Sequence, residues 1–144
     1  MITAMVLEIK MKEGCEDLFP KMAHITDACY DIYAAEDAVI HAHGTKPVHT
    51  GVHMNIPVGY EVVIRPRSGL FYKHGVSCHL GTIDTGYIDE CQVIMWNQSD
   101  KDYEVHRGDR IAQFNVQTLT PTILIKVDEI NAHSRGGGFG STGN

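Results

Sequence analysis

Aspartate, arginine and glycine recur together in short segments of this sequence, and these residue types can hold phosphate groups and activate water. Gly81 and Gly86 bracket a predicted tight hairpin that contains Asp84 and is followed by Tyr87. An aspartate that is ionised at neutral pH can accept a hydrogen bond or a proton from water. Asp84 is therefore a candidate general base, and the alternative is a turn aspartate that satisfies backbone donors.

The segment Arg65–Leu70 indicates a phosphate site where a strand ends and a short helix, expected over Ser68–Lys73, begins. Ser68 can cap that helix. Accessible N–H groups of Ser68 and Gly69, beside the guanidinium of Arg67, are suited to binding phosphate. The alternative is an ordinary helix cap.

Two further segments each carry one polar residue inside a strand-like pattern. Asp31 lies between Tyr30 and Ile32, and a strand places it on the face opposite to theirs. Gln113 interrupts the apolar strand expected after the turn at Arg107–Asp109. The alternatives are a solvent-facing aspartate and an ordinary edge strand.

The last eleven residues, 134–144, read SRGGGFGSTGN and contain five glycines. A segment with one large apolar side chain cannot bury enough surface to offset its ordering entropy, so we expect it to be mobile. Arg135, Phe139 and the accessible glycine N–H groups are what is needed to close over a nucleotide. The alternative is a disordered glycine-rich tail.

Short strands separated by turn clusters make up most of the chain, which predicts an all-β sandwich, jelly roll or barrel. A turn is expected at Glu16–Phe19. One domain over 1–133 and an arm over 134–144 are expected from the length and the absence of an internal linker. The expected strands are Val6–Met11, Tyr30–Tyr33, Ala38–His41, Val48–Met54, Glu61–Arg65, Gln92–Trp96, Tyr103–Val105, Ile111–Gln117 and Thr122–Val127.

Composition and charge limit the classes of partner that the protein can bind. A net charge of −6 with no basic stripe argues against a nucleic-acid polymer but allows a small anionic ligand held by local arginines. The four cysteines show no CxxC spacing, and Met1–Leu7 is too short for a signal peptide, so we expect reduced thiols in a cytoplasm. No apolar run approaches the roughly 18 residues of a membrane span. The spacing of His41, His43, His49 and His53 matches no zinc signature, and we predict no zinc site.

In chain order, DACYDIYA, RPRSGL, GTIDTGY, RGDRIAQF and RGGGFGSTG resemble the five motifs of the trimeric deoxyuridine triphosphatase (dUTPase) family, from about Asp27 to Gly143. The resemblance implies a jelly-roll homotrimer with three active sites at subunit interfaces. It implies hydrolysis of dUTP to dUMP and pyrophosphate with Mg²⁺, which limits uracil in DNA and supplies dUMP for thymidylate synthesis. In most such relatives the tail crosses to a neighbouring subunit's site.

The resemblance also implies roles on the phosphate side. Asp84 would orient and deprotonate the water that attacks the α-phosphorus. Asp31 would reach Mg²⁺ through ordered water, with the ion held mainly by the triphosphate. The matching phosphate contacts are Arg67, Ser68, Gly69 and Gln113.

On the base side, the resemblance implies that the hairpin backbone at Gly81, Thr82 and Ile83 reads uracil. Tyr87 would pack under the deoxyribose and block a 2′-hydroxyl. In the tail, Phe139 would stack on uracil, and the remaining implied contacts, mainly to the γ-phosphate, are Arg135, Gly140, Ser141 and Thr142.

Several positions depart from the family pattern. Val76–Leu80 is about two residues shorter than in many relatives, and Cys78 falls where an asparagine contacting uracil is common. Gly86 replaces the usual acidic residue, and Asp89 replaces a common glycine. These departures bear on the base-side geometry and much less on the phosphate side.

Two alternatives remain. A dCTP deaminase, or a bifunctional deaminase–dUTPase, shares the fold, and Thr85-Gly86-Tyr87 resembles its hairpin; deamination needs a glutamate where this chain has Ile94. The other alternative is a non-catalytic nucleotide-binding or regulatory member. The presence of Asp84 and of the arginine and phenylalanine in the tail argues against it.

Overall fold

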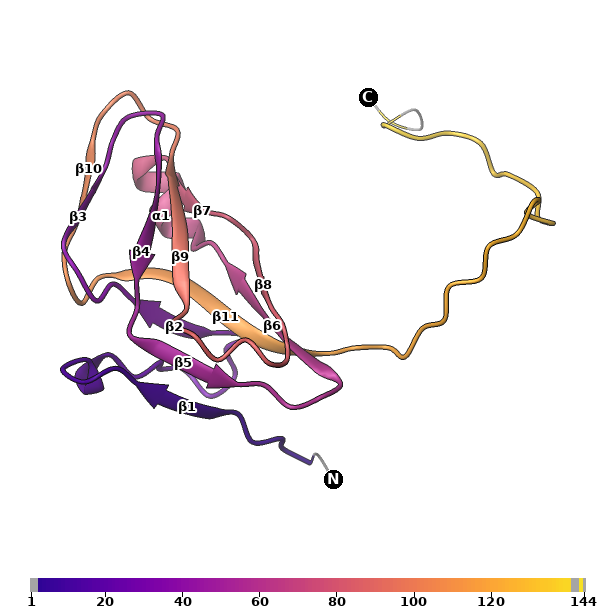
Figure 1. Cartoon of the computed structure of the whole chain (residues 1–144). Helices are drawn as coiled ribbons and strands as arrows, with labels where there is room; N and C mark the ends of the chain where they lie inside the picture. Colours follow the sequence, from indigo (N-terminus) through magenta and orange to yellow (C-terminus); the bar gives the residue numbers. More distant parts are fainter. Residues whose placement is uncertain (1–2, 141–142, 144) are drawn as a thin grey trace.

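The computed structural model describes residues 3–140 and 143, and within them the chain is built almost entirely of short strands (Figure 1). In chain order the elements are β1 (Glu8–Met11), the 3-10 turn η1 (Glu16–Leu18), β2 (Tyr30–Tyr33), β3 (Ala38–Ile40), β4 (Thr45–His49), β5 (Val52–Asn55), β6 (Tyr60–Arg65), α1 (Ser68–His74), β7 (Val76–Cys78), β8 (Gly81–Ile83), β9 (Gln92–Asn97), β10 (Tyr103–Val105) and β11 (Arg110–Thr118). The expected all-β class with one short helix is confirmed.

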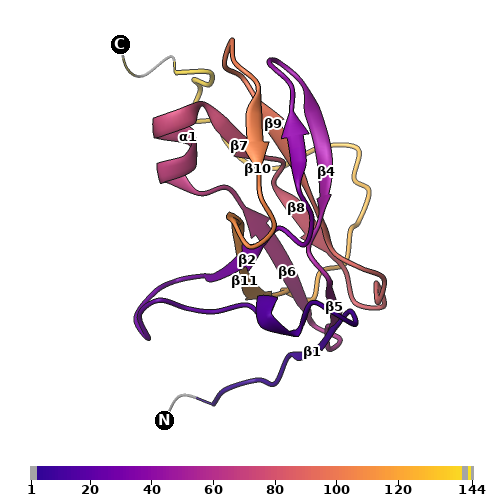
Figure 2. The ribbon, with the colours of Figure 1, turned by 90° about the vertical axis from the view of Figure 1, so that its left-hand side faces the viewer.

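The described strands form four antiparallel sheets whose neighbours are mostly distant in sequence. The largest has the order β2-β11-β6-β8, and the next has the order β4-β9-β7. Two-stranded sheets, β1-β5 and β10-β3, complete the arrangement. Figure 2 shows α1 beside β7, above the large sheet. β11, the last strand of the described part of the chain, therefore lies in the large sheet between β2 and β6, which come much earlier.

One hydrophobic core joins the two larger sheets. Ile32, Val62 and Phe114 come from the four-stranded sheet, while Val48 and Met95 come from the three-stranded sheet, and all are almost completely buried. Burying such a side chain contributes about 1.5–3 kcal/mol. The alternation along β9, with every second residue buried, fixes which side chains reach the core and which reach the surface.

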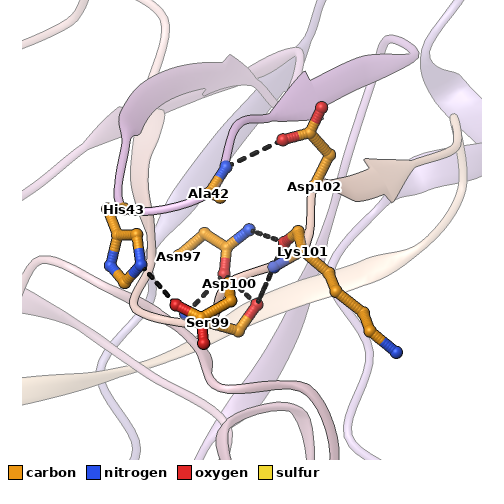
Figure 3. Close-up of polar contacts among 7 residues, drawn as sticks. All are labelled: Ala42, His43, Asn97, Ser99, Asp100, Lys101 and Asp102. Carbon is orange, nitrogen blue, oxygen red and sulfur yellow. Dashed lines mark hydrogen bonds and ion pairs between the residues drawn. The ribbon is translucent and has the colours of Figure 1, made fainter.

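A buried amide closes one end of the molecule (Figure 3). The side-chain nitrogen of Asn97 donates to the carbonyls of Ile40 and Lys101 at 2.9 and 2.7 Å. Beside it, the Asp102 carboxylate accepts the N–H of Ala42 at 2.9 Å. Because its polar atoms are paired, burial of Asn97 carries no penalty for unmet hydrogen bonds. The network ties the β3–β4 turn to the β9–β10 loop.

The helix begins where the sequence predicts but is not capped by serine. Ser68 is the first residue of α1, and the N-cap position is Arg67, which makes no side-chain capping bond. The expected cap by Ser68 is therefore wrong. Gly75 ends the helix with φ 68°, and its N–H donates to the carbonyl of Phe71 at 2.8 Å. This left-handed cap turns the chain directly into β7, a strand not expected from the sequence.

The expected strand Val48–Met54 is divided. It spans the end of β4, a turn at Thr50 and Gly51, and the start of β5. Gly51 has φ 73°, which a strand residue does not adopt. The side chain of Thr50 is fully buried, so this turn points into the body of the protein.

The strand expected over Thr122–Val127 is wrong, since no strand follows β11 in the described part of the chain. Ile123, Leu124 and Ile125 are 87%, 92% and 78% exposed. Strand propensity depends on packing against a neighbouring strand, and this segment runs away from the sheets (Figure 1). No helix in the described part of the chain is long and apolar enough to cross a membrane.

Replacing Gly51 by alanine tests how tightly the β4–β5 turn is packed. An added Cβ would lie 2.7 Å from Cys15 Cβ, in a left-handed conformation. We expect Gly51→Ala to cost about 2–4 kcal/mol from strain and overpacking, measured by urea unfolding. Gly59→Ala is the matched control, because Gly59 has φ 92° but nothing within 4 Å of its added Cβ. Its cost should be about 1 kcal/mol, and equal losses would contradict the packing argument.

Candidate active site

Asp31 is held between two arginines at one end of the large sheet. Its carboxylate, 18% exposed, lies 3.7 Å from Nε of Arg67 and 3.6 Å from Nη1 of Arg110. Arg67 also donates to the carbonyl of Arg110 at 3.4 Å. Two cations around one anion leave a local positive charge that favours an anionic ligand in a chain of net charge −6.

The central position of β11 brings these groups together. Gln113 lies opposite Asp31 on β2 and opposite Arg65 on β6. Its side-chain nitrogen donates to the carbonyl of Pro66 at 2.9 Å, which fixes the entry to the helix. Ser68 and Gly69 follow in the exposed first turn of α1, where backbone N–H groups have no intrahelical partner.

Arg110 is a member of this group that the sequence reasoning missed. It lies in the RGDRIAQF segment, between the turn and the strand, where the sequence pattern singles out only Gln113. The other arginine of that segment, Arg107, is occupied by Asp17 at 2.9 Å. Only a pairing across β11 and β2, which the local sequence does not specify, distinguishes the two arginines.

A second group of predicted residues lines a cavity of about 440 Å³ beside β8. A cavity of this size can hold a nucleoside. A Cβ on Gly81 would lie 3.3 Å from Cβ of Ile64, so a larger residue would push β8 away from β6. The cavity-lining residues predicted from the sequence are Gly81, Thr82, Ile83, Asp84 and Tyr87, and the strand opposite adds Gln92 and Ile94.

The turn after β8 presents Asp84 to solvent. The N–H of Tyr87 donates to the backbone carbonyl of Asp84 at 3.2 Å, and Gly86 has φ 92°. The carboxylate of Asp84 is exposed and makes no hydrogen bond or ion pair with any residue in the described part of the chain. The alternative of a turn aspartate that satisfies backbone donors is therefore not what the structure contains.

Cys78 lies outside this cavity. It is buried in β7, opposite Met95, and burial raises the pKa of its thiol to about 11. His79, the next residue, lines the cavity instead. Cys78 lies where the family resemblance implies a uracil contact; its side chain belongs to the core cluster and also lines a second pocket, which shares His79 and Ile94 with this cavity.

The predicted tail residues do not join either group within one chain. Arg135 and Gly140 are exposed, and the ring of Phe139 is fully exposed. Ser141 and Thr142 lie outside the described residues. Figure 1 shows that the segment after β11 runs away from the strands.

The two groups of site residues lie toward opposite ends of β6. Ile83 pairs with Val62, so Asp84 follows at the level of Glu61, whereas Arg67 comes after the far end of the strand at Arg65. Four residues of strand span about 13 Å. Within one chain, the cluster around Asp31 and the cavity beside β8 therefore lie at different levels of β6.

The four histidines noted in the sequence have separate partners rather than a shared one. Among residues 3–140 and 143, no group of three or more His, Cys, Asp or Glu could hold a metal ion. The contacts are His41 with Asp102 (3.2 Å), His43 with Asp100 (2.8 Å, Figure 3), His49 with Glu90 (2.9 Å) and His53 with the carbonyl of Ile88 (2.9 Å).

Comparison with known proteins identifies the family of the chain. The sequence model of the dUTPase family matches residues 18–143. The deoxyuridine 5′-triphosphate nucleotidohydrolase of Zymomonas mobilis is 40% identical over 141 residues, covering 95% of this chain and 97% of its own length. That of Eremothecium gossypii is 42% identical over 127 residues, covering 87% and 83%. The chain belongs to the dUTPase family.

Solved structures agree on the fold. The dUTPase of Staphylococcus bacteriophage 80alpha, solved with dUpNHpp, matches with a TM-score of 0.88 at 27% identity, over 96% of this chain and 99% of that one. A variant of the phage phi11 dUTPase, which coordinates a structural Mg(II) ion, has a TM-score of 0.80 at 24% identity and shows the fold alone, covering 88% and 99%. The expected jelly-roll-like fold is confirmed.

Proposed function

We propose that this protein hydrolyses dUTP to dUMP and pyrophosphate, limiting uracil in DNA and supplying dUMP for thymidylate synthesis. The observation that carries the proposal is the exposed carboxylate of Asp84, which has no partner among the described residues and lies at a cavity of nucleoside size. An exposed carboxylate can orient a water molecule and accept its proton as that water attacks the α-phosphorus. General-base assistance of this kind contributes about 10²–10⁴-fold to the rate.

The cluster around Asp31 supplies the phosphate side. The guanidinium groups of Arg67 and Arg110 and the amide of Gln113 would hold phosphate oxygens, with the first-turn N–H groups of Ser68 and Gly69 beside them. Charge neutralisation and positioning supply much of the barrier reduction in phosphoryl chemistry.

Magnesium fits this donor set. One carboxylate, Asp31, is too few for a protein cage but suits an ion that keeps several waters and binds mainly to phosphates. When bound, the ion would neutralise triphosphate charge. Asp31 would hold one of its waters while both arginines keep that carboxylate oriented.

The backbone edge of β8 would read the base. β8 is the outermost strand of its sheet, so one side of Gly81–Ile83 pairs with β6 and the other has no strand partner. Uracil offers acceptors at O2 and O4 and a donor at N3, which free N–H and C=O groups can complement. The ring of Tyr87, which lines the same cavity, would pack under the deoxyribose.

Deamination of dCTP is not favoured. Ile94, at the position where a deaminase needs a glutamate, lines the cavity and cannot carry a proton. A purely nucleotide-binding role leaves the free carboxylate of Asp84 without a purpose.

We further propose a homotrimer with active sites between subunits. About 13 Å of β6 lies between the levels of Asp84 and Arg65, and in the homotrimer that we propose each complete site takes one group from each of two chains. The exposed apolar segment Ile123–Val127 would pack on a neighbour. Beyond it, the arm at 134–144 would bring Arg135, Phe139 and Gly140 over bound nucleotide, with Ser141 and Thr142 beside the γ-phosphate. Four free cysteines suit a cytoplasm, or a host cytoplasm for a viral protein.

Pyrophosphate release from dUTP, dCTP, dTTP and UTP with Mg²⁺ tests reaction and substrate together. We expect hydrolysis of dUTP and a preference of roughly 10⁴–10⁵ over dCTP, because cytosine leaves buried polar groups unpaired. Release of ammonia from dCTP would support the deaminase instead. Absence of pyrophosphate from every nucleotide would contradict the enzymatic proposal.

Asp84→Asn should lower kcat for dUTP by about 10²–10⁴-fold, because an amide cannot accept the proton of water. Nucleotide binding, followed by calorimetry with dUpNHpp, should persist. Asp89→Asn is the matched control, since Asp89 is exposed and lies in the same connection. Wild-type turnover in Asp84→Asn would exclude the water-activating role.

Mixing two inactive variants tests whether sites form between chains. Arg67→Ala and Asp84→Asn, refolded together at equal amounts, should regain about a quarter of wild-type activity if each site takes one group from each of two neighbours in a ring. Each variant refolded alone is the control. A mixture that stays inactive would place the whole site in one chain.

A further inference from the structure

The connection between β8 and β9 is held by side chains rather than by strand pairing. Residues 84–91 belong to no strand, yet they carry Asp84 and Tyr87. The hydroxyl of Thr85 donates to the carbonyl of Pro57 at 3.1 Å, and Nδ1 of His53 donates to the carbonyl of Ile88 at 2.9 Å. The far end of the connection is held by Glu90.

Glu90 gathers three donors on one carboxylate oxygen. Its Oε2 accepts from Nδ1 of His49 at 2.9 Å and from the N–H groups of Thr50 and Gly51, both at 3.2 Å. The side chain is 15% exposed. Partial burial acts to raise the pKa of Glu90, but the Gly51 N–H and the His49 imidazole lower it below its ordinary value. Glu90 is thus a charged group in a site built for it.

The turn that Glu90 binds is rigid. Thr50 is fully buried, and its hydroxyl donates to the carbonyl of Cys91 at 2.6 Å. The N–H of Cys91 donates in turn to the carbonyl of Val52 at 2.8 Å. Gly51 leaves no room for a side chain against Cys15. Glu90 therefore connects the β8–β9 connection to a fixed part of the core.

Tyr87 depends on the same residue. Its hydroxyl donates to the backbone carbonyl of Glu90 at 3.2 Å, while its ring, 45% exposed, lines the cavity. Ile88 and Asp89 separate Tyr87 from Glu90; the carbonyl of Ile88 accepts from His53, and Asp89 makes no hydrogen bond with any residue that the structure describes. Among the described residues, the hydrogen bond that the side chain of Tyr87 makes is the one to Glu90.

We propose that Glu90 is a positioning residue that sets the place of Tyr87 and thereby the preference for deoxyribose over ribose. The proposal rests on the proposed dUTP hydrolysis, in which Tyr87 packs under the sugar. A ring held at its hydroxyl end cannot swing away to admit a 2′-hydroxyl. If an amide replaces the carboxylate, the three donors share a weaker, neutral acceptor, and the backbone carbonyl of Glu90 that holds the ring is less firmly placed.

Steady-state kinetics of Glu90→Gln with dUTP and UTP test this role. We expect kcat/KM for dUTP to fall about tenfold, mainly through KM, which is the effect of losing about one charged hydrogen bond. The ratio of kcat/KM for dUTP to kcat/KM for UTP should fall by a similar factor. Asp89→Asn, an exposed neighbour of the same charge, should leave the ratio unchanged.

A double-mutant cycle separates positioning from general loss of structure. Tyr87→Phe keeps the ring but removes the hydroxyl donor, and it should also lower the dUTP-to-UTP ratio of kcat/KM. The variant carrying both substitutions should narrow it no further, because both changes act on one contact. Additive effects, or a lowered Tm with an unchanged ratio, would overturn the proposal.

His49→Asn covers the case in which Glu90→Gln does not fold. It removes one donor and leaves the two backbone donors in place, so the ratio should narrow by a smaller factor. An unchanged ratio in both His49→Asn and Tyr87→Phe would exclude the role. Failure of the wild-type protein to hydrolyse dUTP would contradict the proposed function itself, which is a separate result.

Discussion

The register of β6 is the constraint on which the arrangement of the site depends. It pairs with β8 along one edge and with β11 along the other, so each neighbour can carry functional groups only at fixed levels. Asp84 follows β8 at the level of Glu61, near the start of β6. Gln113 on β11 pairs with Arg65 at the other end of β6, and Arg67 comes two residues later. A change of strand register would move buried side chains out of the core between the two larger sheets, so the register is fixed as long as the domain stays folded.

Local patterns predict the residues that carry the chemistry better than they predict their surroundings. Asp84 and Gln113 stand out in sequence because of a glycine turn and a break in an apolar strand; in the structure Asp84 lines a cavity, and Gln113 pairs with Asp31. Arg110 cannot be told from Arg107 by local sequence, because their difference arises from partners far along the chain. Glu90 has no local signal at all, since its three donors lie about forty residues earlier.

The errors have a common physical origin in non-local pairing. Thr122–Val127 has the composition of a strand but no neighbour in its own chain, and β7 is a strand of three residues because β9 offers it an edge.

The departures from the family pattern are concentrated where side chains, rather than backbone pairing, hold the chain. Gly86 and Asp89 replace residues that the family commonly has on either side of the tyrosine, and the connection around them is fixed by His53 and Glu90. The phosphate-side cluster is built on the central strand β11 instead.

The shortness of β8 has a consequence of its own. An unpaired sheet edge is a template on which other chains can add a strand, and proteins limit the danger by keeping such edges short. β8 has only three residues, Gly81–Ile83, so its outer side presents few backbone groups. That span is too small to recruit a foreign strand but comparable to the hydrogen-bonding edge of a single pyrimidine. The short edge that protects the protein against edge-to-edge aggregation thus also has room to hydrogen-bond only a ligand as small as one ring.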